Sequence, residues 1–555
     1  MEIHPLSPVL SVSPQLSTAD LQAVRDAGFK SVICNRPDNE DADQPNFVDI
    51  ERVALALGLQ AKHLPAESGK VSDDQGAAFG KLMTALPKPV LAFCRTGMRS
   101  TTMWALSEAK QTPLPTLIER ASKADFDLKP LVRRIANGGK TPVEVIEDTH
   151  DVVIVGGGAG GIAVAASLLA RNPALDIAII DPANVHYYQP GWTMVGAGVF
   201  EAASTARTLA SVLPRGVHWL QSAVAAFEPE RNAVVLDGCR VVKYEQLVVC
   251  PGLKLDWDGV EGLVDTLGRN GVTSNYRFDL APYTWELVQQ LKHGRAIFSQ
   301  PPMPIKCAGA PQKAMYLSAD HWRRTGALSS IDIQFCNSGA VLFGVADYVP
   351  ALMEYIEAYG IHLNFGETLV AVDGPARQAV FSRATPDGGK ERITREFDML
   401  HAVPPQKSPD FVRVSPLADA AGWVDVDPGT LRHKQFANVF ALGDVANTTN
   451  AKTMAAARKQ APVVAHNLLA VRGAAKGEAI YNGYGSCPLT VERGKIVLAE
   501  FTYGGKLAPS FPKWLIDGTR PSALAWQLKE RVLPPLYWDC MLKGREWMAR
   551  PEMVG

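Results

Sequence analysis

One segment that begins at residue 151 limits the folds open to this chain more than any other. Residues 151–155 read DVVIV, an apolar run that predicts a buried strand, and a glycine-rich loop, GGGAGG, follows directly. Gly156, Gly158 and Gly161 have the GxGxxG spacing. The first glycine permits a tight turn, the second lets a pyrophosphate approach the backbone, and the third lets the next helix pack closely on the strand. The segment therefore predicts a dinucleotide-binding fold.

A second strand supports this interpretation. Residues 176–180 predict a strand that ends in Asp181, twenty residues after Gly161. A carboxylate at this position accepts hydrogen bonds from the ribose hydroxyls of a bound dinucleotide. NAD and FAD both bind such loops, so a further feature is needed to distinguish them.

That feature lies near residue 440. Residues 438–444 read NVFALGD, which predicts a strand ending in Gly443 and Asp444, and a long helix is expected from about Lys452. In flavoproteins with two dinucleotide folds, this pattern places the carboxylate on the ribityl chain and directs the helix dipole toward the isoalloxazine. The sequence therefore predicts FAD, held by residues of both motifs: Gly156, Gly158, Gly161, Asp181, Gly443, Asp444 and Lys452.

The segment where such proteins carry a second nucleotide loop is different here. A predicted strand at residues 295–299 leads into QPPMPIKCAGAP, whose prolines lack the backbone N–H groups that a phosphate cradle needs. A later strand, residues 331–335, leads to CNSG, which is not a dinucleotide fingerprint either. The sequence thus disfavours NAD(P)H, and it places Cys307 where a nicotinamide would approach.

Residues 1–110 alternate predicted helices and strands, which indicates a small α/β domain with a largely parallel sheet. Cys94 follows an apolar strand and opens the loop CRTGMRS, which precedes a helix. Such a loop points successive backbone N–H groups at an anion, and Arg99 with the helix dipole is expected to lower the pKa of the Cys94 thiol. The sequence therefore predicts Cys94 as a nucleophile and Arg99 as its partner.

This loop resembles those of protein tyrosine phosphatases and rhodanese-type sulfurtransferases, and residues 1–110 resemble a dual-specificity-phosphatase-like family assigned as sulfur transferases. Phosphatases have one more residue between cysteine and arginine, and a histidine usually precedes the cysteine, where this chain has Phe93. The shorter loop favours sulfur over phosphate as the transferred group. Four polar residues are expected to line or brace the same end of the sheet: Asn35, Arg36, Asp38 and His63.

The composition of the chain limits the binding partners and the cellular location that are expected. The 555 residues include 56 basic and 57 acidic residues, a net charge of -1, so nucleic acid is not expected as a partner. The eight cysteines include no CxxC pair, so neither a disulfide scaffold nor a metal site is expected. The N-terminus lacks the regions of a signal peptide, and no transmembrane helix is predicted. The expected location is therefore the cytoplasm, with peripheral contact to the inner face of a membrane as an addition.

Four regions are expected along the chain, the first being residues 1–110. Residues 111–150 predict a helical linker, residues 151–480 an FAD-dependent oxidoreductase with a second nucleotide-type fold inserted at about 285–400, and residues 481–555 a C-terminal segment. Between 511 and 548 this segment combines aromatic and basic residues, which suits a bilayer interface, although a helical pair packed on the core has the same composition. The whole chain is expected to be α/β, with two Rossmann-like dinucleotide folds after the N-terminal domain.

About residues 151–550 resemble the sulfide:quinone oxidoreductases, most closely their mitochondrial-like branch. Five strings carry the resemblance: HYYQPGWTMVGAG from 186, GVTSNY from 271, KCAGAPQKAMYLS from 306, PLADAAGWVDVD from 416 and YNGYGSCPL from 481. Membership implies that sulfide is oxidised at a cysteine pair beside the flavin, that the sulfane sulfur passes to an acceptor, and that electrons leave to a membrane quinone. Cys307 matches one cysteine of the family, and Lys306 beside it favours a thiolate.

One position departs from the pattern of this family. The family has Gly-Asp-Cys where this chain has Gly443, Asp444 and Val445, so the cysteine next to the flavin is absent there. Cys250 or Cys336 would replace it if the fold brought either one close to Cys307. A buried structural role is the alternative for both cysteines.

The sequence as a whole predicts a bifunctional enzyme of sulfur metabolism. FAD oxidises sulfide or a persulfide, electrons pass to a quinone, and sulfane sulfur moves from Cys307 to Cys94 and then to a small thiol or sulfite. Three alternatives stay open: an NAD(P)H-dependent persulfide or disulfide reductase, a cysteine phosphatase with a flavin redox sensor, and a sulfur-carrier scaffold with a static flavin. Self-association into a homo-oligomer also stays open.

Overall fold

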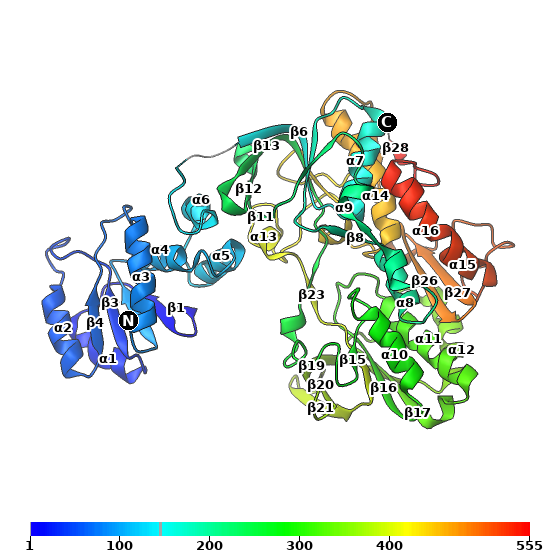
Figure 1. Ribbon diagram of the computed structural model, residues 1–555, viewed down its shortest axis with the longest axis horizontal. Helices are drawn as coiled ribbons and strands as arrows, with labels where there is room; N and C mark the ends of the chain where they lie inside the picture. Colours follow the sequence, from blue (N-terminus) through cyan, green and yellow to red (C-terminus); the bar gives the residue numbers. More distant parts are fainter. Residues whose placement is uncertain (1, 144–146, 555) are drawn as a thin grey trace. The chain divides into compact units, whose positions relative to one another are not determined.

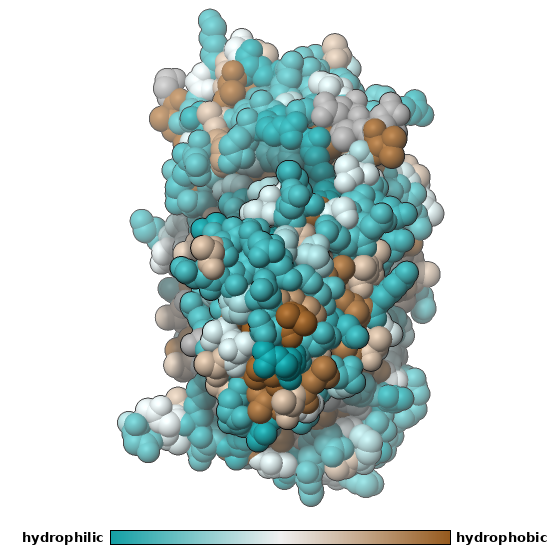
Figure 2. Space-filling view, turned by 90° about the vertical axis from the view of Figure 1, so that its left-hand side faces the viewer, coloured by the Kyte–Doolittle hydropathy of each residue, from teal (hydrophilic) through white to brown (hydrophobic). Residues whose placement is uncertain are grey.

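The structure is a computed structural model that describes residues 2–143 and 147–554. Helices and strands alternate through most of the chain (Figure 1). The face drawn in Figure 2 is mostly hydrophilic, with small groups of hydrophobic residues. The chain folds into two compact units, each built from segments that are distant in sequence: residues 1–149, 222–243 and 410–416 form the first, and residues 150–221, 244–409 and 417–555 form the second.

The first unit is built on a five-stranded sheet in the order β1-β2-β5-β3-β4. Its strands are β1 (His4–Ser7), β2 (Leu10–Ser13), β3 (Ser31–Cys34), β4 (Gln60–His63) and β5 (Val90–Phe93). β1 and β2 form an antiparallel hairpin, whereas β2, β5, β3 and β4 run parallel. β3 and β5 are buried along their whole length, because apolar clusters cover both faces of the sheet.

Four helices provide that cover: α1 (Leu21–Asp26), α2 (Phe47–Ala56), α3 (Asp73–Ala85) and α4 (Met98–Glu108). α1 and α2 contribute Leu21 and Ile50 to the cluster on one face, and α3 and α4 contribute Phe79 and Trp104 to the cluster on the other. This arrangement confirms the small α/β domain with a largely parallel sheet. The sequence does not predict the β1–β2 hairpin, whose strands are too short for a clear alternation of apolar residues.

The residues after 110 also pack on the core of the first unit. They form α5 (Leu114–Lys123) and α6 (Val132–Ala136), which bury Leu117 and Ile135 in that core. The unit further includes the hairpin of β11 (Val224–Glu228) and β12 (Ala233–Leu236) and the short helix α13 (Asp410–Arg413). An ion pair of 3.2 Å joins Arg133 to Glu228. Residues 144–146 of the expected linker lie outside the described residues.

The glycine-rich loop belongs to the first sheet of the second unit. Strands β6 (Glu147–Val155), β7 (Ile177–Ile180) and β10 (Val217–Leu220) run parallel, and β13 (Val241–Val249) pairs in parallel with β24 (Val439–Ala441). Helices α7 (Ala159–Arg171) and α14 (Met454–Val471) pack against each other. A Cβ on Gly160 would lie 3.5 Å from Cγ of Leu442, so the loop after β6 and the end of β24 are neighbours. The two cofactor motifs thus meet at one edge of the sheet.

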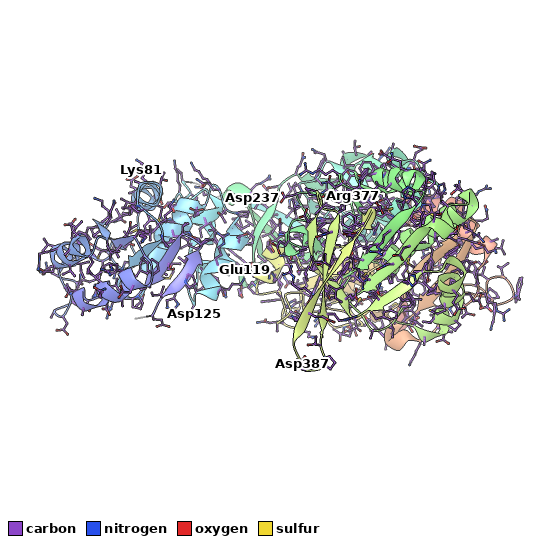
Figure 3. All side chains as sticks on the ribbon, turned by 90° about the horizontal axis from the view of Figure 1, so that it is seen from below. Lys81, Glu119, Asp125, Asp237, Arg377 and Asp387 are labelled. Atoms are coloured by element: carbon purple, nitrogen blue, oxygen red, sulfur yellow. The ribbon has the colours of Figure 1, made fainter. Side chains whose placement is uncertain are left out.

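A second parallel sheet follows in the order β15-β22-β16-β17-β18 and forms the second Rossmann-like fold. Its strands are β15 (Val272–Thr273), β16 (Gly294–Gln300), β17 (Ile331–Asn337), β18 (His362–Phe365) and β22 (Met399–His401). A three-stranded antiparallel sheet is attached to it, formed by β19 (Glu367–Asp373), β20 (Gln378–Ala384) and β21 (Lys390–Glu396). Asp387 marks the tip of the β20–β21 hairpin (Figure 3).

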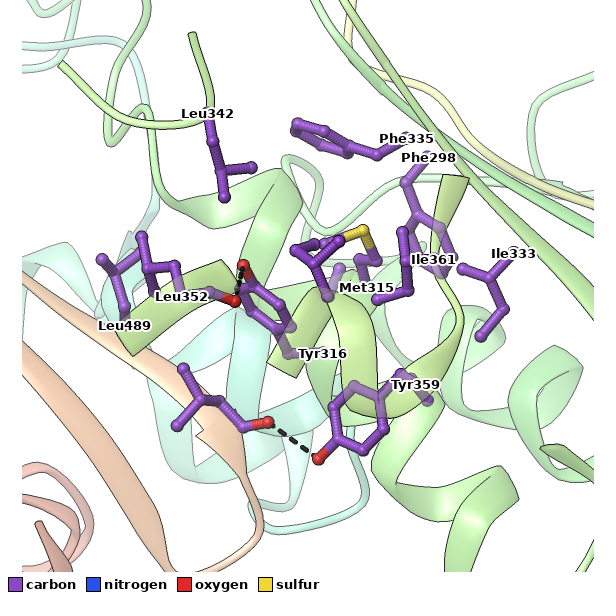
Figure 4. Close-up of a cluster of buried hydrophobic side chains, with 14 of the residues drawn as sticks. Phe298, Met315, Tyr316, Ile333, Phe335, Leu342, Leu352, Tyr359, Ile361 and Leu489 are labelled. Carbon is purple, nitrogen blue, oxygen red and sulfur yellow. Dashed lines mark hydrogen bonds between the residues drawn. The ribbon is translucent and has the colours of Figure 1, made fainter. Parts of the chain in front are cut away.

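Three helices accompany this second sheet: α10 (Ala281–Gln290), α11 (Ala310–Thr325) and α12 (Val349–Tyr359). Their apolar faces and the inner strands form one large cluster of buried side chains, part of which is drawn in Figure 4. Within it, the Tyr316 hydroxyl donates to the Leu352 carbonyl, and the Tyr359 hydroxyl donates to the Val491 carbonyl at 3.1 Å. The C-terminal part of the chain therefore shares this core.

That C-terminal part begins with the hairpin of β26 (Gly485–Glu492) and β27 (Lys495–Phe501). Residues 523–543 are helical and include two π-helical turns, at 528–532 and 536–540. β25 (Glu478–Ile480) pairs with β28 (Glu552–Val554) near the end of the chain. Over residues 2–143 and 147–554, no helix is both long enough and apolar enough to cross a membrane.

Candidate active site

The GxGxxG loop has the conformation that its glycines predict. Gly156 has a φ of +112°, in the left-handed region that other residues rarely adopt. A Cβ on Gly161 would lie 2.0 Å from the carbonyl oxygen of Gly156, so only glycine fits there. A Cβ on Gly158 would meet nothing within 4 Å, which leaves open space at the N-terminus of α7. This space suits a pyrophosphate, because helix N-termini offer free amide groups and a positive dipole end.

Asp181 lies beside the loop, directly after β7. Its Oδ2 accepts a hydrogen bond from the Gly157 amide at 2.6 Å, and its Oδ1 accepts one from the Ala183 amide at 2.8 Å. His186 also reaches the loop, with Nδ1 3.2 Å from the Gly157 carbonyl oxygen, and its Nε2 contacts the Tyr537 hydroxyl. The carboxylate is thus held next to the glycines, and its contact with a ribose stays a prediction.

The second motif lies at the carboxyl end of β24. The Gly443 amide donates to Oε1 of Gln460 on α14 at 2.8 Å. Burial raises the pKa of the Asp444 carboxyl above its usual value, although the Lys452 and Lys306 cations oppose this shift. Burial also lowers the pKa of Lys452 to about 8. Burial disfavours the charged form of this carboxyl group, and a hydrogen bond from a hydroxyl donor stabilises it. The ribityl chain of FAD has several hydroxyl groups, so the site fits this cofactor.

Cys307 lies in the turn before α11, where it meets a cysteine of the C-terminal hairpin. Its Sγ is 3.9 Å from Sγ of Cys487 in β26, although 180 residues separate the two in sequence. Cys487 is 3% exposed, and Cys307 is half-buried. Since the S–S bond of a disulfide is about 2.05 Å long, the two sulfurs need to approach by roughly 2 Å to form a disulfide once an acceptor removes two electrons from the pair.

Two buried lysines surround the pair. Nζ of Lys313, on α11, is 3.2 Å from Sγ of Cys307. The hydrogen bond from Cys487 and the Lys313 cation hold the pKa of the Cys307 thiol well below its usual range, whereas the same hydrogen bond raises the pKa of Cys487. Burial and the Lys313 cation lower the pKa of Lys529 to about 7. Cys307 is therefore the thiolate of the pair.

The lysine and the second cysteine that contact Cys307 differ from those expected from the sequence. Lys306 directs its Nζ to Oε1 of Gln189, at 2.7 Å, and the lysine that contacts the sulfur is Lys313. The physical reason is that adjacent residues of a turn point in different directions, whereas the next helix turns Lys313 back over Cys307.

Cys250 and Cys336 are both buried, which agrees with the alternative interpretation of each as a buried structural residue. Cys250 is buried after β13, with Sγ 3.7 Å from the Gly156 carbonyl oxygen. Cys336 is fully buried in β17, where burial raises its pKa to about 12. Val445 is also fully buried, and the sulfur that contacts Cys307 is that of Cys487.

Cys487 also carries a signal in the sequence. It lies in YNGYGSCPL, one of the five strings that carry the family resemblance, within the segment interpreted as a membrane contact. A cysteine inside such a string is as good a candidate as Cys307. Its pairing with Cys307 does not follow from the sequence, because the two residues meet only when β26 packs against α11.

The Cys94 loop of the first unit connects β5 to α4. The Gly97 amide donates to Sγ of Cys94 at 3.1 Å. Arg99 is buried, and both of its terminal nitrogens donate to the Glu40 carboxylate at 2.8 Å. The hydrogen bond from Arg99, followed by that from Arg36, lowers the pKa of Glu40 to about 2, against the effect of its partial burial. Glu40, which the sequence analysis did not single out, therefore neutralises the cation expected to assist Cys94.

The four polar residues near this loop act as braces. Asn35 donates its Nδ2 to the Leu64 carbonyl at 2.9 Å, and the Phe47 amide donates to Oδ1 of Asp38 at 2.8 Å. Nε2 of His63 is 2.9 Å from the Arg36 carbonyl oxygen, and Arg36 is paired with Glu40. These contacts fix the ends of β3 and β4 around the loop.

Comparisons with known proteins agree with this geometry. The family described as Beta-lactamase hydrolase-like protein, phosphatase-like domain, matches residues 2–111, and the Pyridine nucleotide-disulphide oxidoreductase family matches residues 150–289. The mitochondrial sulfide:quinone oxidoreductase of Dictyostelium discoideum is 40% identical over 417 residues, which cover 74% of this chain and 90% of that protein. The protein of the same name from Mus musculus is 37% identical over 395 residues, which cover 71% and 87%.

The chain belongs to the sulfide:quinone oxidoreductase family. The family membership confirms the predicted fold class and makes the chain an FAD-dependent oxidoreductase with a phosphatase-like N-terminal domain. The crystal structure of the sulfide:quinone oxidoreductase from the bacterium Aquifex aeolicus has a TM-score of 0.59 and 18% identity, covering 72% of this chain and 92% of that one. At this identity, the likeness shows a shared fold.

The expected cytoplasmic location is wrong. The relatives from Dictyostelium discoideum and Mus musculus, which match most of the chain, are both named as mitochondrial proteins. The expectation rested on a missing signal peptide, and the features of a secretory signal do not distinguish among the compartments inside a cell.

The glycine positions generate a first prediction. Gly158→Ala places a methyl group in the open space expected to hold the pyrophosphate, so the protein should fold and bind FAD at least about tenfold more weakly. Gly161→Ala forces a Cβ against the Gly156 carbonyl, so it should lower both the FAD content and the melting temperature of the apoprotein. The measurements are flavin absorbance, FAD titration and thermal unfolding.

Gly344→Ala serves as the control, because a Cβ there also meets nothing within 4 Å and the residue lies outside the loop. FAD binding of wild-type strength in Gly158→Ala would contradict this position for the pyrophosphate.

Proposed function

We propose that this chain oxidises sulfide at the Cys307–Cys487 pair and passes the electrons through FAD to a quinone. The observation that carries the proposal is the 3.9 Å contact between the two sulfur atoms, beside the Lys313 ammonium. A cysteine of low pKa next to a second cysteine has the properties of a thiol–disulfide redox centre. Sulfide and quinone are the substrate and acceptor in the names of the relatives that match most of the chain.

The reaction balances at the two sulfur atoms. Hydrosulfide attacks one sulfur of a Cys307–Cys487 disulfide, the S–S bond breaks, and a persulfide and a thiolate result. Because its pKa is the lower one, Cys307 is the better leaving group, so the persulfide forms on Cys487. An acceptor thiolate then takes the outer sulfur, and re-forming the disulfide releases two electrons. FAD, when bound, accepts this electron pair.

The two lysines stabilise the charges that appear during these steps. Lys313 contacts Sγ of Cys307 and stabilises the leaving thiolate. Lys529 has a pKa of about 7, so at neutral pH it exists in both protonation states and can exchange a proton with the sulfur groups.

Serine substitutions test the pair. Cys307→Ser and Cys487→Ser each remove one sulfur of the disulfide, so each should slow reduction of the flavin by sulfide at least about 100-fold. The measurement is anaerobic stopped-flow absorbance with sulfide, with and without a soluble quinone. Cys540→Ser is the control, since this half-buried cysteine lies in the C-terminal helical segment.

Reduction at the wild-type rate in either pair variant would rule out the Cys307–Cys487 centre. Faster reduction by NADH than by sulfide in the wild type would instead favour an NAD(P)H-dependent reductase.

We further propose that sulfane sulfur moves from the pair to Cys94 and then to a small thiol or sulfite. Support comes from the Cys94 loop, whose Gly97 amide donates to Sγ and would stabilise a persulfide anion at the same place. In this step the Cys94 thiolate takes the outer sulfur from the persulfide of the pair, and the acceptor then takes it from Cys94, with no net oxidation.

Cys94→Ser separates this transfer from sulfide oxidation. The variant should lose formation of thiosulfate from sulfite, or of the small-thiol persulfide, while reduction of the flavin by sulfide keeps its wild-type rate. Products are measured by thiol labelling and chromatography after turnover with quinone. Equal loss of flavin reduction would overturn the order of the relay, and unchanged product formation would show that the acceptor takes sulfur directly from the pair.

The C-terminal segment is proposed to contact a membrane surface peripherally. Trp514 and Trp547 are 84% and 58% exposed, and the neighbouring cations Lys513 and Arg520 have side chains that are 82% and 83% exposed. Exposed tryptophans with basic neighbours are typical of a segment that lies in the interface of a bilayer.

Alanine at both tryptophans should weaken binding to anionic vesicles. We expect Trp514→Ala/Trp547→Ala to bind vesicles that contain phosphatidylglycerol at least about tenfold more weakly in a sedimentation assay, because two interfacial anchors are lost. Val341→Ala, at an exposed apolar residue of the second Rossmann-like fold, is the control. Wild-type protein that stays in the supernatant with these vesicles would disprove the contact.

A further inference from the structure

Cys307 has a backbone conformation that a cysteine rarely adopts. Its φ is +49°, in the left-handed region, where the Cβ of an L residue crowds its own carbonyl. Such a conformation persists only where the surrounding structure imposes it. The Cys307 amide donates to the Lys452 carbonyl at 2.8 Å, and its carbonyl accepts from the Ala310 amide at 2.8 Å. The side chain of Tyr276 also contacts this backbone, because its hydroxyl donates to the Cys307 carbonyl.

The Tyr276 hydroxyl is shared by two successive carbonyls of the turn. It lies 3.0 Å from the Lys306 carbonyl oxygen and 3.2 Å from that of Cys307. The residue is 4% exposed, and burial raises its pKa well above the usual value, so the phenol keeps its proton and remains a donor. The residue before it is also fixed, because the Asn275 amide donates to Nε2 of His401 at 2.9 Å.

We propose that Tyr276 is a positioning residue for the cysteine pair: its hydroxyl holds the Cys307 backbone in the left-handed conformation from which Sγ faces Cys487 and Lys313. The inference rests on the proposed function, since it treats the pair as the redox centre. Without the hydroxyl, the turn can relax toward an ordinary φ. Sγ of Cys307 then moves away from the Lys313 ammonium, and the thiolate loses its nearest cation.

Charged and titratable groups face Cys307 from every element packed against it. They are Lys313 on α11, Cys487 on β26, Lys529 in the 528–532 turn, Tyr276 after β15, Lys306 in the same turn and Asp444 after β24. A displacement of Sγ weakens its contacts with Cys487, at 3.9 Å, and with Lys313, at 3.2 Å. Apart from the Tyr276 hydroxyl, the other groups are shared by the wild type and the variant, so the difference between the two reports the loss of this hydroxyl and the resulting position of the sulfur.

The test is the pH dependence of alkylation of Cys307 in Tyr276→Phe. Phenylalanine keeps the ring and removes only the donor. The full-length protein with bound FAD is reduced, treated with iodoacetamide over a range of pH, and analysed by mass spectrometry of the peptide that contains Cys307. In the wild type the rate should reach half its maximum well below pH 9, the usual pKa of a cysteine, because the thiolate is the reactive form.

In Tyr276→Phe this midpoint should rise by about one pH unit, since the thiolate is less stabilised. The kcat for sulfide should fall about tenfold with little change in KM, because the hydroxyl does not touch the substrate.

Tyr359→Phe is the matched control. Tyr359 is also 4% exposed, and its hydroxyl also donates to a backbone carbonyl, that of Val491 (Figure 4). It should lose a similar amount of thermal stability and leave the alkylation profile of Cys307 unchanged.

Three results would count against these ideas in different ways. An unchanged profile in Tyr276→Phe overturns the positioning role, even if the melting temperature falls, because Tyr276 would then be merely structural. Equal shifts in Tyr276→Phe and Tyr359→Phe overturn it as well. A wild-type midpoint near pH 9 overturns the proposed function instead, since Cys307 would not be a thiolate at neutral pH.

Discussion

A buried ammonium 3.2 Å from the sulfur of the half-buried Cys307 is the interaction on which the candidate site depends. Burial alone opposes the charge on Lys313, yet the Cys307 thiolate raises the pKa of this lysine above its usual value. Each charge is therefore stable only because the other is present, and removal of either one leaves an uncompensated charge in the core. The hydrogen bond between the two cysteines, together with the Lys313 cation, makes the pair asymmetric: the pKa of Cys307 is lowered, and the hydrogen bond raises that of Cys487.

The fold supplies the parts of this site from elements far apart in the sequence. The turn that carries Cys307 and helix α11, which carries Lys313, belong to the second Rossmann-like fold. The C-terminal hairpin supplies Cys487, and a π-helical turn after it supplies Lys529. The cysteine pair proposed as the sulfur centre thus lies beside the second FAD motif, since the Cys307 amide donates to the Lys452 carbonyl. The first unit holds Cys94, the predicted nucleophile, on a loop whose arginine, Arg99, is paired with Glu40.

Most of the fold could be predicted from the sequence because its signals are local. The strand, glycine loop and helix around Gly156 follow one another within a few residues, and the same is true of β24 and the turn with Asp444, and of the Cys94 loop. The choice between Lys306 and Lys313 could not be made in this way, because it depends on the direction in which a turn and a helix point each side chain. Glu40 was missed because a carboxylate in a polar loop has no distinctive pattern.

The sequence by itself determined the α/β class, the FAD motifs, the family and the two cysteine loops, since each is encoded by residue types at fixed short spacing. Only the tertiary structure decided which cysteine partners Cys307, which cation stabilises it and which tyrosine holds its backbone. These are contacts between segments whose separation in the chain says nothing about their distance in space. Their energies arise from burial and from charges a few ångströms apart, and both exist only after the core has formed.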